Sequence, residues 1–276
     1  MLKREILKKN ILQIYSLIIK DLKLKSRYKA ELIVEFFFPF LALFFPFIIF
    51  NTLLSLDVDV FKGYYSKENF VLFLLLGYIV HSCIFLLWHY KDLFYDEKTW
   101  KTLHGILISP VKKINVLIGY YISGLLTKSF AIIIIAIICY IFYPIPFFTL
   151  FLALLLLFCI SITFAGMGFF LGSLEVVNEN ISASLAAGIS FIAIASCLFY
   201  PIEIFPESVH FFILSNPLYY YFDLLRLIWW SGINSDAVHY ITIIHILVVV
   251  CFTITIPIFA SIFFYRVINR YGVRGY

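Results

Sequence analysis

The 276-residue chain is 63% hydrophobic and 20% aromatic, only 13% of its residues are charged, and its mean hydropathy is +1.00. Soluble domains are about half apolar and about a quarter charged. The composition therefore excludes a soluble enzyme, a nucleic-acid-binding protein and a disordered chain, and it indicates a protein of the lipid bilayer. Each of the five cysteines lies alone in an apolar run, which favours small core residues over disulfides or a zinc site.

Six apolar runs are long enough to cross a bilayer, because about 20 helical residues span a hydrocarbon layer about 30 Å thick. Lys128 is the only formal charge in the long run from residue 114 to residue 174, which the prolines of Tyr143–Pro146 divide into two spans. The six spans are predicted at residues 36–56 (beginning near Ala30), 69–90, the two halves of 114–174, 180–202 and 237–265.

Positive charge is distributed unevenly between the predicted loops. Of the 21 Lys and Arg residues, 17 precede the first span, connect the second to the third or follow the sixth. The opposite loops hold three, Lys62, Lys67 and Arg226. Because Lys and Arg concentrate on the cytoplasmic side, we expect a multi-pass protein of the cytoplasmic membrane with both termini in the cytoplasm.

Residues 1–29 predict an amphipathic helix rather than a signal peptide, since they hold no short apolar core followed by a cleavage site. An apolar stripe recurs at helical spacing on an otherwise basic segment, and it consists of Leu7, Ile11, Ile14, Ile18 and Leu22. We expect this helix to lie along the inner membrane surface; a cytosolic helix packed on protein is the alternative. Residues 30–276 are expected to form one six-span membrane domain.

Motifs for catalysis or nucleotide binding are missing from the sequence. It contains no phosphate-binding loop, HExxH motif or GxSxG motif, so we expect no enzymatic activity and no cofactor in this chain. Asp92 and Asp96 have the DxxxD spacing that membrane prenyltransferases use for magnesium, but the other acids nearby are only Glu175 and Glu179. The favoured interpretation is a solvated helix face that carries Asp92, Asp96, Glu97, Lys98 and Lys101.

Four polar residues fall in or beside predicted spans. Lys128 lies about 21 Å of helix past the start of the third span, where a charge is costly unless it is paired or hydrated. Glu31 and Glu35, one turn apart at the inner end of the first span, are candidate partners. These residues either line a transport path or form a structural pair. For His81, deep in the second span, a structural hydrogen bond is favoured over a proton relay.

The connection between the second and third spans carries the most specific motifs. A charged helix is followed by Ser109-Pro110, by Lys112-Lys113 and then by Gly119. This order resembles the loop of type-2 ABC exporter permeases, in which a Gly-Thr-Leu-Glu stretch leads to leucines, Ser-Pro, a basic residue and a membrane-entry glycine. The segment Lys101–His104 departs from that pattern because it lacks the leading glycine and the glutamate.

The segment before the sixth span resembles the outer re-entrant hairpin of the same family. The residues that carry this resemblance include Pro206, Asn216, Pro217, Asp223 and Arg226. From residue chemistry alone, Asn216 is a good N-cap and Pro217 a good first residue of a helix. Asp223 and Arg226 share a helix face and can pair. Trp229 and Trp230 are expected to anchor the helix end at the outer headgroups.

The resemblance implies an all-α permease that forms a homodimer and rests on two copies of a separate ATPase that binds ATP and magnesium. It also implies a cytoplasmic coupling helix within residues 92–113 and a lesser contact at Ser173–Asn180. The coupling residues would be Asp92, Asp96, Glu97, Lys98, Lys101, Ser109 and Pro110.

Ser109-Pro110 resembles the drug, lipid and lipo-oligosaccharide branch of this family. The resemblance implies export of a hydrophobic or lipid-linked substrate such as a drug, a lipid or a lipo-oligosaccharide, along a path between the first, second and fifth spans. Polysaccharide or teichoic-acid export by the same superfamily is the alternative. An ATP-independent channel and an intramembrane enzyme are the remaining hypotheses.

Overall fold

The computed structural model describes residues 2–27, 70–102, 105 and 109–271, together with isolated positions between residues 33 and 52. Within this part of the chain every regular element is a helix, which confirms the all-α fold. The elements are α1 (Leu2–Arg27), α3 (Phe70–Thr99), α5 (Lys113–Phe142), α6 (Phe147–Val177), α7 (Glu179–Ile194), η2 (Ile202–Ile204), α8 (Glu207–Leu214), α9 (Pro217–Ile233), η3 (Ser235–Tyr240) and α10 (Ile243–Tyr271).

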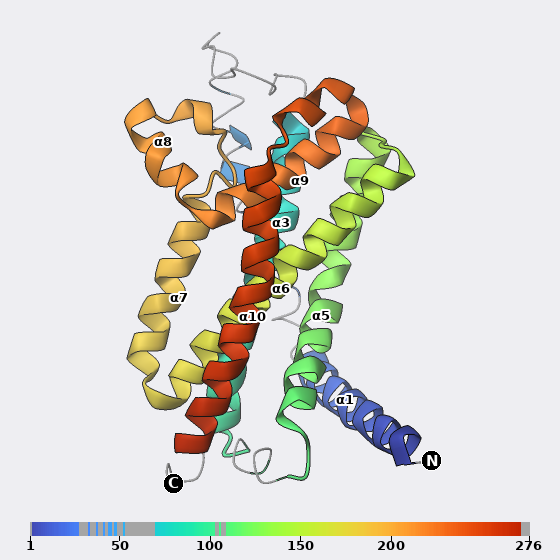
Figure 1. Ribbon diagram of the computed structural model, residues 1–276, viewed down its shortest axis with the longest axis vertical. Coiled ribbons are helices and arrows are strands. Elements are labelled where there is room, and N and C mark those ends of the chain that lie inside the picture. Colours follow the sequence, from blue (N-terminus) through green and yellow to red (C-terminus); the bar gives the residue numbers. More distant parts are fainter. Residues whose placement is uncertain are drawn as a thin grey trace.

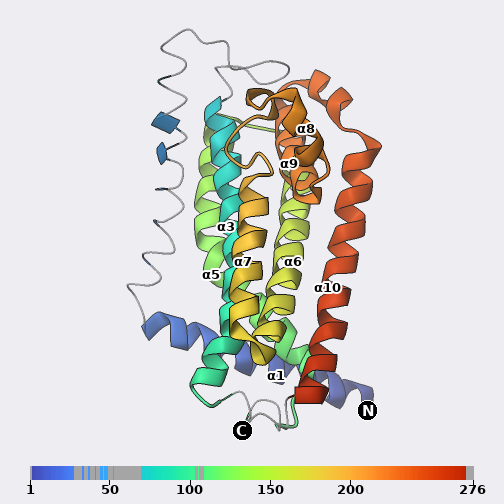
Figure 2. The same ribbon diagram turned by 90° about the vertical axis from the view of Figure 1, so that its left-hand side faces the viewer.

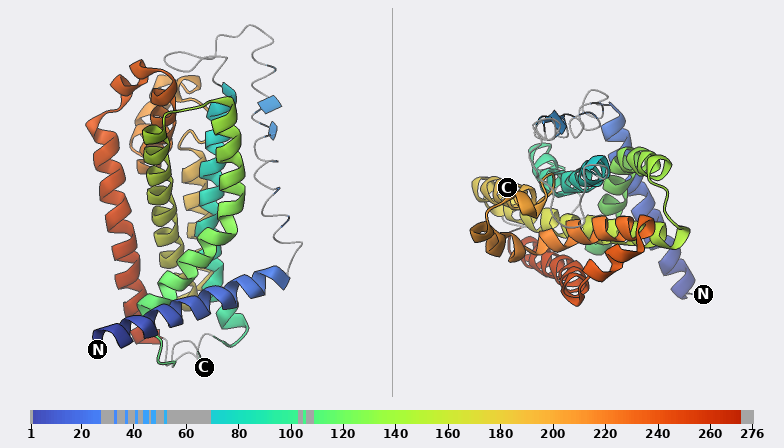
Figure 3. Two further views of the ribbon diagram at one scale, coloured as in Figure 1. Left: turned by 90° about the vertical axis from the view of Figure 1, so that its right-hand side faces the viewer. Right: turned by 90° about the horizontal axis from the view of Figure 1, so that it is seen from above.

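The long helices stand side by side in a bundle, and α1 lies across one end of it (Figures 1 and 2). Helix α6 is central, because it packs against α3, α7, α9 and α10. Helix α1 packs against α5 and lies crosswise to the long helices, as Figure 3 shows. The helices α8, α9 and η3 gather at the opposite end (Figure 1). We call these two ends the α1 end and the α9 end.

Three of the described helices are long and apolar enough to cross a membrane. They contain the stretches Phe70–Glu97, Phe147–Glu175 and Ile243–Val267. Helix α5 would be a fourth span if its two parts, which are bent by 46° between Ser129 and Ile132, cross together. These helices correspond to the predicted second, third, fourth and sixth spans. The predicted first span lies outside the described residues apart from isolated positions.

The predicted fifth span extends too far, because α7 ends at Ile194 and not near residue 202. The chain turns after Ile194, and Cys197 adopts a positive φ of 60°, a conformation that does not continue an α-helix. A side chain from α9 binds this turn, since Arg226 donates hydrogen bonds to the carbonyl oxygens of Cys197 and Leu198. Helix α7 is therefore a short apolar helix rather than a full-length span.

The predicted start of the sixth span is also wrong by several residues. Residues Ser235–Tyr240 form the separate 3₁₀ helix η3, in which the Asn234 side chain accepts a hydrogen bond of 3.1 Å from the backbone N–H of Asp236. By contrast, the break between α5 and α6 falls where the two prolines predict it, because α5 ends at Phe142 and α6 begins at Phe147.

The core lies where α3 meets α6 and α9. Tyr78, Phe164, Tyr221 and Trp229 are among its fully buried side chains. Many apolar side chains remain exposed around the bundle, most of all along α10, which matches a surface in contact with lipid hydrocarbon. The protein is therefore a multi-pass helical membrane protein.

Candidate functional site

Glu97 is the centre of a polar junction between three helices at the α1 end. Its side chain is almost fully buried at the end of α3. It accepts a hydrogen bond of 2.8 Å from the Tyr120 hydroxyl on α5, and it also binds the Lys20 ammonium on α1 and the Thr102 hydroxyl. The interpretation of this face as solvated is wrong for Glu97, because α1 and α5 both pack over it.

Helix α1 also binds the start of α5. The Asn115 amide donates hydrogen bonds to Gln13 Oε1 at 2.7 Å and to Asn10 Oδ1 at 3.2 Å, and Gln13 in turn donates to the carbonyl of Pro110. Helix α1 is therefore tied to both sides of the connection between α3 and α5.

Gly119 lies where α1 crosses α5. A Cβ atom at this position would lie 2.9 Å from the Cβ of Leu17, so only glycine allows the two helices to approach this closely. Among the α1 side chains whose burial is described, Leu17 is the one apolar residue buried in the core, whereas Leu7 and Ile11 of the predicted apolar stripe are exposed. Ile14, Ile18 and Leu22 of the stripe are half-buried, so only its N-terminal part is fully open to the membrane surface.

Lys91 and Glu175 form a buried ion pair between the same ends of α3 and α6. The Lys91 ammonium lies 3.2 and 3.3 Å from the two Glu175 carboxylate oxygens and 2.6 Å from Asp92 Oδ1. Both members of the Lys91–Glu175 pair are less than a tenth exposed, whereas the Asp92 side chain is half exposed. In the described ranges, no three His, Cys, Asp or Glu side chains converge to hold a metal ion.

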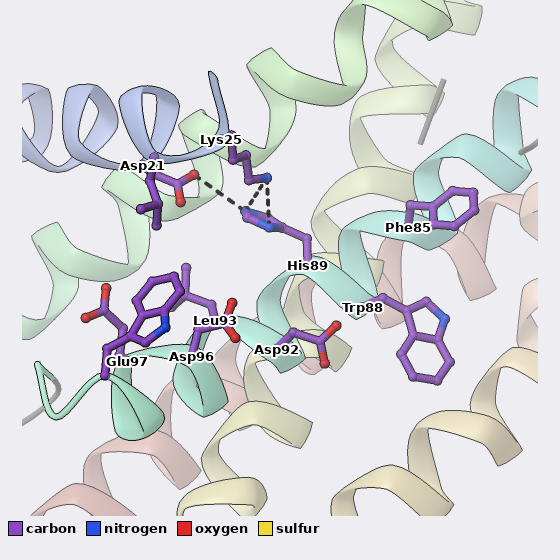
Figure 4. Close-up of a pocket in the computed structure, with 11 residues that line it drawn as sticks. Asp21, Lys25, Phe85, Trp88, His89, Asp92, Leu93, Asp96 and Glu97 are labelled. Atoms are coloured by element: carbon purple, nitrogen blue, oxygen red, sulfur yellow. Dashed lines mark hydrogen bonds and ion pairs between the residues drawn. The ribbon is translucent and has the colours of Figure 1, made fainter. Parts of the chain in front are cut away.

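A cavity of about 320 Å³ lies between α1 and α3 beside this junction (Figure 4). Asp21 of α1 lies on its wall, accepts a hydrogen bond of 2.6 Å from Ser123, and lies 3.8 Å from His89 of α3. The Lys25 ammonium contacts the other ring nitrogen of His89 at 3.0 Å. Asp92 and Asp96 line the same cavity, so the structure brings the predicted DxxxD pair to its edge.

The remaining predicted coupling residues follow the cavity-lining residues of α3 along the chain, and their surroundings differ from one residue to the next. Lys98 belongs to the last turns of α3. Lys101 is exposed in the turn that follows and has a positive φ of 58°. Ser109 donates its backbone N–H to the carbonyl of Gly105 at 3.1 Å, and Pro110 is exposed. The α1 end therefore presents an exposed turn on top of a buried polar junction.

The predicted intramembrane polar residues are only partly described. Lys128 is buried, and its ammonium lies 5.0 Å from the centroid of the Phe85 ring. Glu31 and Glu35 lie outside the described residues, so their pairing with Lys128 stays a prediction. His81 packs against the rings of Phe85 and Phe199. Its Nδ1 is buried with no hydrogen-bond partner in the described part of the chain, so the predicted structural hydrogen bond is not found at this nitrogen.

At the α9 end, the start of α9 is as predicted. The Asn216 side chain accepts a hydrogen bond of 3.0 Å from the backbone N–H of Leu218, and Pro217 is the first helical residue. Helix α8 begins directly after Pro206, whose backbone is extended and which occupies the N-cap position. The Asn216 amide also donates to Ser196 at 2.6 Å and thereby ties α9 to the turn after α7.

Asp223 and Arg226 are both buried on α9, and each has a partner that the sequence did not suggest. Asp223 Oδ2 lies 3.1 Å from His245 Nε2 at the start of α10. Arg226 binds the carbonyl groups after α7, and its guanidinium stacks 3.6 Å from the Phe73 ring centroid. A direct ion pair between Asp223 and Arg226 stays a prediction.

The expectation that Trp229 anchors α9 at the headgroups is wrong. Trp229 is only 1% exposed, and its indole N–H donates to the carbonyl of Tyr143 at 3.3 Å. The indole therefore packs inside the bundle against the turn between α5 and α6.

Glu203 in η2 provides a pH-dependent contribution to stability. Partial burial raises the pKa of its carboxyl group above the ordinary value of 4.5, and one carboxylate oxygen is buried with no hydrogen-bond partner among the described residues. The folded state then holds this proton more tightly than the unfolded state, so stability falls as pH rises above 4.5. We expect Glu203→Gln to flatten this fall, so that thermal unfolding curves of the variant and the parent protein differ at pH 8 and converge near pH 4. Equal differences at both pH values would contradict this.

The geometry and composition together define a polytopic helical membrane protein with polar, partly buried junctions at both ends of its bundle. The sequence model of the ABC-2 type transporter family matches residues 12–230, which include the larger part of α1, the residues around Glu97 and most of α9. The chain belongs to this family. This confirms the resemblance to type-2 ABC exporter permeases. No curated protein matches the chain.

Proposed function

We propose that this chain is the permease subunit of an ATP-driven exporter and that a separate ATPase subunit supplies the energy. Its family is one of transporter membrane domains, and its sequence holds no phosphate-binding loop. The observation that carries the proposal is the buried junction around Glu97. It connects the end of α3 to α1 and α5 just below the exposed turn at Trp100–Thr102.

The α1 end is the side on which we place the ATPase. The Lys and Arg excess of 17 to 3 belongs to the loops and termini of this end, which is the pattern of a cytoplasmic face. A partner that pushes on the exposed turn after α3 also displaces Glu97, and with it the helices that bind the carboxylate. Residues 92–113 then act as the coupling segment, and the loop between α6 and α7 is a lesser contact.

The assembly that we propose is a homodimer of permeases on two ATPase copies in the cytoplasmic membrane. We propose that residues 30–56 form the first span and that α7, although too short for a full-length span by itself, occupies the place of the fifth, so that each chain has six membrane segments. We propose a hydrophobic or lipid-linked cargo, which the Ser109-Pro110 motif and the exposed apolar sides of the bundle favour. Polysaccharide or teichoic-acid export is the alternative cargo class.

Purification of the chain from its native membrane in mild detergent tests the proposal. We expect a stoichiometric partner that contains a phosphate-binding loop, identified by mass spectrometry, and stimulation of its ATP hydrolysis by this chain. Glu97→Gln should reduce that stimulation roughly tenfold, because a charge-assisted hydrogen-bond network is lost from the junction.

Asp236→Asn is the matched control, since it removes one carboxylate from an exposed position at the α9 end. It should leave the stimulation unchanged. If the chain purifies alone and remains active in liposomes without nucleotide, the exporter proposal is wrong, and the channel and enzyme hypotheses take its place.

A further inference from the structure

One buried imidazole, that of His245, connects α10 to α9. His245 lies in the first turn of α10, and its Nε2 lies 3.1 Å from Asp223 Oδ2 on α9. The Tyr220 ring of α9 packs edge-on against the imidazole, with 5.3 Å between the ring centroids. The other ring nitrogen, Nδ1, lies 2.7 Å from the Thr242 hydroxyl and 3.3 Å from the Thr242 backbone nitrogen. The ring therefore contacts a carboxylate of α9 with one nitrogen and the backbone before α10 with the other.

The partners of the two nitrogens determine which of them carries the hydrogen in a neutral His245 ring. A backbone N–H can only donate, so Nδ1 must present its lone pair to the Thr242 N–H. An ionised carboxylate can only accept, so Nε2 must carry the hydrogen that faces Asp223. The two requirements agree, and together they specify the Nε2–H form of the neutral ring.

The contact with Thr242 is a capping box in which histidine takes the place of glutamate or glutamine. Thr242 directly precedes α10 and so has the N-cap position, and His245 is the third residue of the helix. In a capping box the side chain of the third residue accepts a hydrogen bond from the N-cap backbone N–H, which has no partner within the helix. Glutamine keeps this acceptor at every pH between 5 and 8, whereas histidine ordinarily changes charge in that range.

Protonation of His245 would break one of its contacts and strengthen the other. The added proton goes to Nδ1, which then has no lone pair for the Thr242 N–H. The Thr242 hydroxyl can accept a hydrogen bond from the new Nδ1–H, but the backbone N–H of Thr242 cannot. The bond from Nε2–H to Asp223 becomes charge-assisted. The ring thus stays attached to α9, while the backbone at the start of α10 loses its cap.

The charges near His245 belong to α9 and to the short helices beside it. Helix α6, which packs along α10, has no Asp, Glu, Lys, Arg or His between Phe147 and Leu174. On α9 the guanidinium of Arg226, one turn beyond Asp223, binds the carbonyl groups after α7. The other titratable groups of the α9 end are those of Glu203, Glu207, His210, Tyr219, Tyr220, Asp236, His239 and Tyr240. Among the described residues, Asp223 is the charged group that contacts the imidazole, so protonation of His245 brings two opposite charges together.

We propose that His245 is a pH-sensitive connection between α9 and α10. The neutral ring caps α10 and binds Asp223, whereas the protonated ring releases the Thr242 N–H and keeps Asp223. The inference rests on the proposed function for the assignment of the α9 end to the outer face, from which the proton then comes. Acid on the outer side thereby loosens the first turn of the last span without detaching that span from α9.

Amide hydrogen exchange of the full chain in nanodiscs at pH 8 and pH 5 tests the proposal, with each rate corrected for the intrinsic chemical rate at that pH. We expect the protection of the Thr242 amide to fall about fivefold at pH 5, the effect of losing one hydrogen bond. Amides in the middle of α10 should keep their protection. His245→Gln should protect the Thr242 amide equally at both pH values, because glutamine is an ordinary capping-box acceptor.

His239→Gln is the matched control, since it makes the same substitution at an exposed position of the α9 end and should behave as the parent protein does. Nitrogen-15 NMR of the histidine rings keeps the test decisive if His245→Gln fails to fold. His245 is identifiable by selective labelling, because it is the only histidine of the chain that follows an isoleucine. At pH 8 its Nε2 should carry hydrogen and its Nδ1 should not.

Three results would overturn the proposal: an Nδ1–H ring at pH 8, protection of the Thr242 amide in the parent that is the same at both pH values, or a His245→Gln variant that responds to pH as the parent does. The measurements need neither an ATPase nor a cargo. Their failure is therefore distinguishable from failure of the exporter proposal.

Discussion

Replacing Gly168 with alanine should lower the free energy of unfolding by about 3 kcal/mol, the upper end of the usual cost of overpacking a core. A Cβ atom there would lie 2.5 Å from the carbonyl oxygen of Leu87 and 2.9 Å from the Cβ of Tyr90, so the backbones of α6 and α3 would have to separate. These two helices form the centre of the bundle. The measurement is thermal or denaturant unfolding of the purified chain in detergent.

Gly188 provides the control for this prediction. It is also a helical glycine, but a Cβ at its position would meet no atom within 4 Å. Gly188→Ala should therefore stabilise the protein by about 0.5–1 kcal/mol through the higher helix propensity of alanine. Equal effects of the two substitutions would mean that the close approach of α3 and α6 at Gly168 is incorrect.

Lys91→Met should destabilise the protein by about 3–5 kcal/mol, because it removes the ammonium group that binds the buried Glu175 carboxylate. The double variant Lys91→Met/Glu175→Gln should recover much of that loss, since a buried pair replaced as a whole costs less than a pair broken on one side. Unfolding measurements on both single variants and the double variant form a cycle that isolates the coupling between the two residues.

The exposed neighbour of Lys91 supplies the control for this cycle. Asp92 also contacts the Lys91 ammonium, but its side chain is half exposed, so Asp92→Asn should change stability by less than about 1 kcal/mol. If Lys91→Met is equally harmful with and without Glu175→Gln, the two residues are not energetically coupled. The interpretation of Lys91 and Glu175 as a stabilising buried ion pair is then wrong.

Local chemistry in the sequence predicts element boundaries well where a residue acts on its own backbone. The prolines near residue 145 end α5 before α6 begins, and Asn216 with Pro217 starts α9. Prediction fails where a distant residue determines the boundary. Helix α7 stops at Ile194 while Arg226, far along the chain, binds the turn that follows, and no pattern within the α7 sequence signals that contact.

The candidate site likewise has some features that the sequence predicts and others that it does not. The charges of the segment around Asp92 and its position between two spans are visible in the sequence, but the burial of Glu97 is not. An apolar stripe is a strong signal, whereas a polar face that packs on another polar face looks like a solvated one. The spacing of Asn10, Gln13, Leu17 and Asp21 by three or four residues was the available sign of a second packing face on α1.

The transverse position of α1 has a mechanical consequence for the environment of the protein. One face of this helix is fixed by hydrogen bonds to Glu97 and Asn115, while Leu7 and Ile11 on another face remain uncovered. A change in bilayer thickness, lateral pressure or surface charge that moves the uncovered face also pulls on the ends of α3 and α5. The lipid composition of the membrane would thereby influence the conformation of the helix bundle. A transport rate measured in one lipid mixture would then differ from the rate in another.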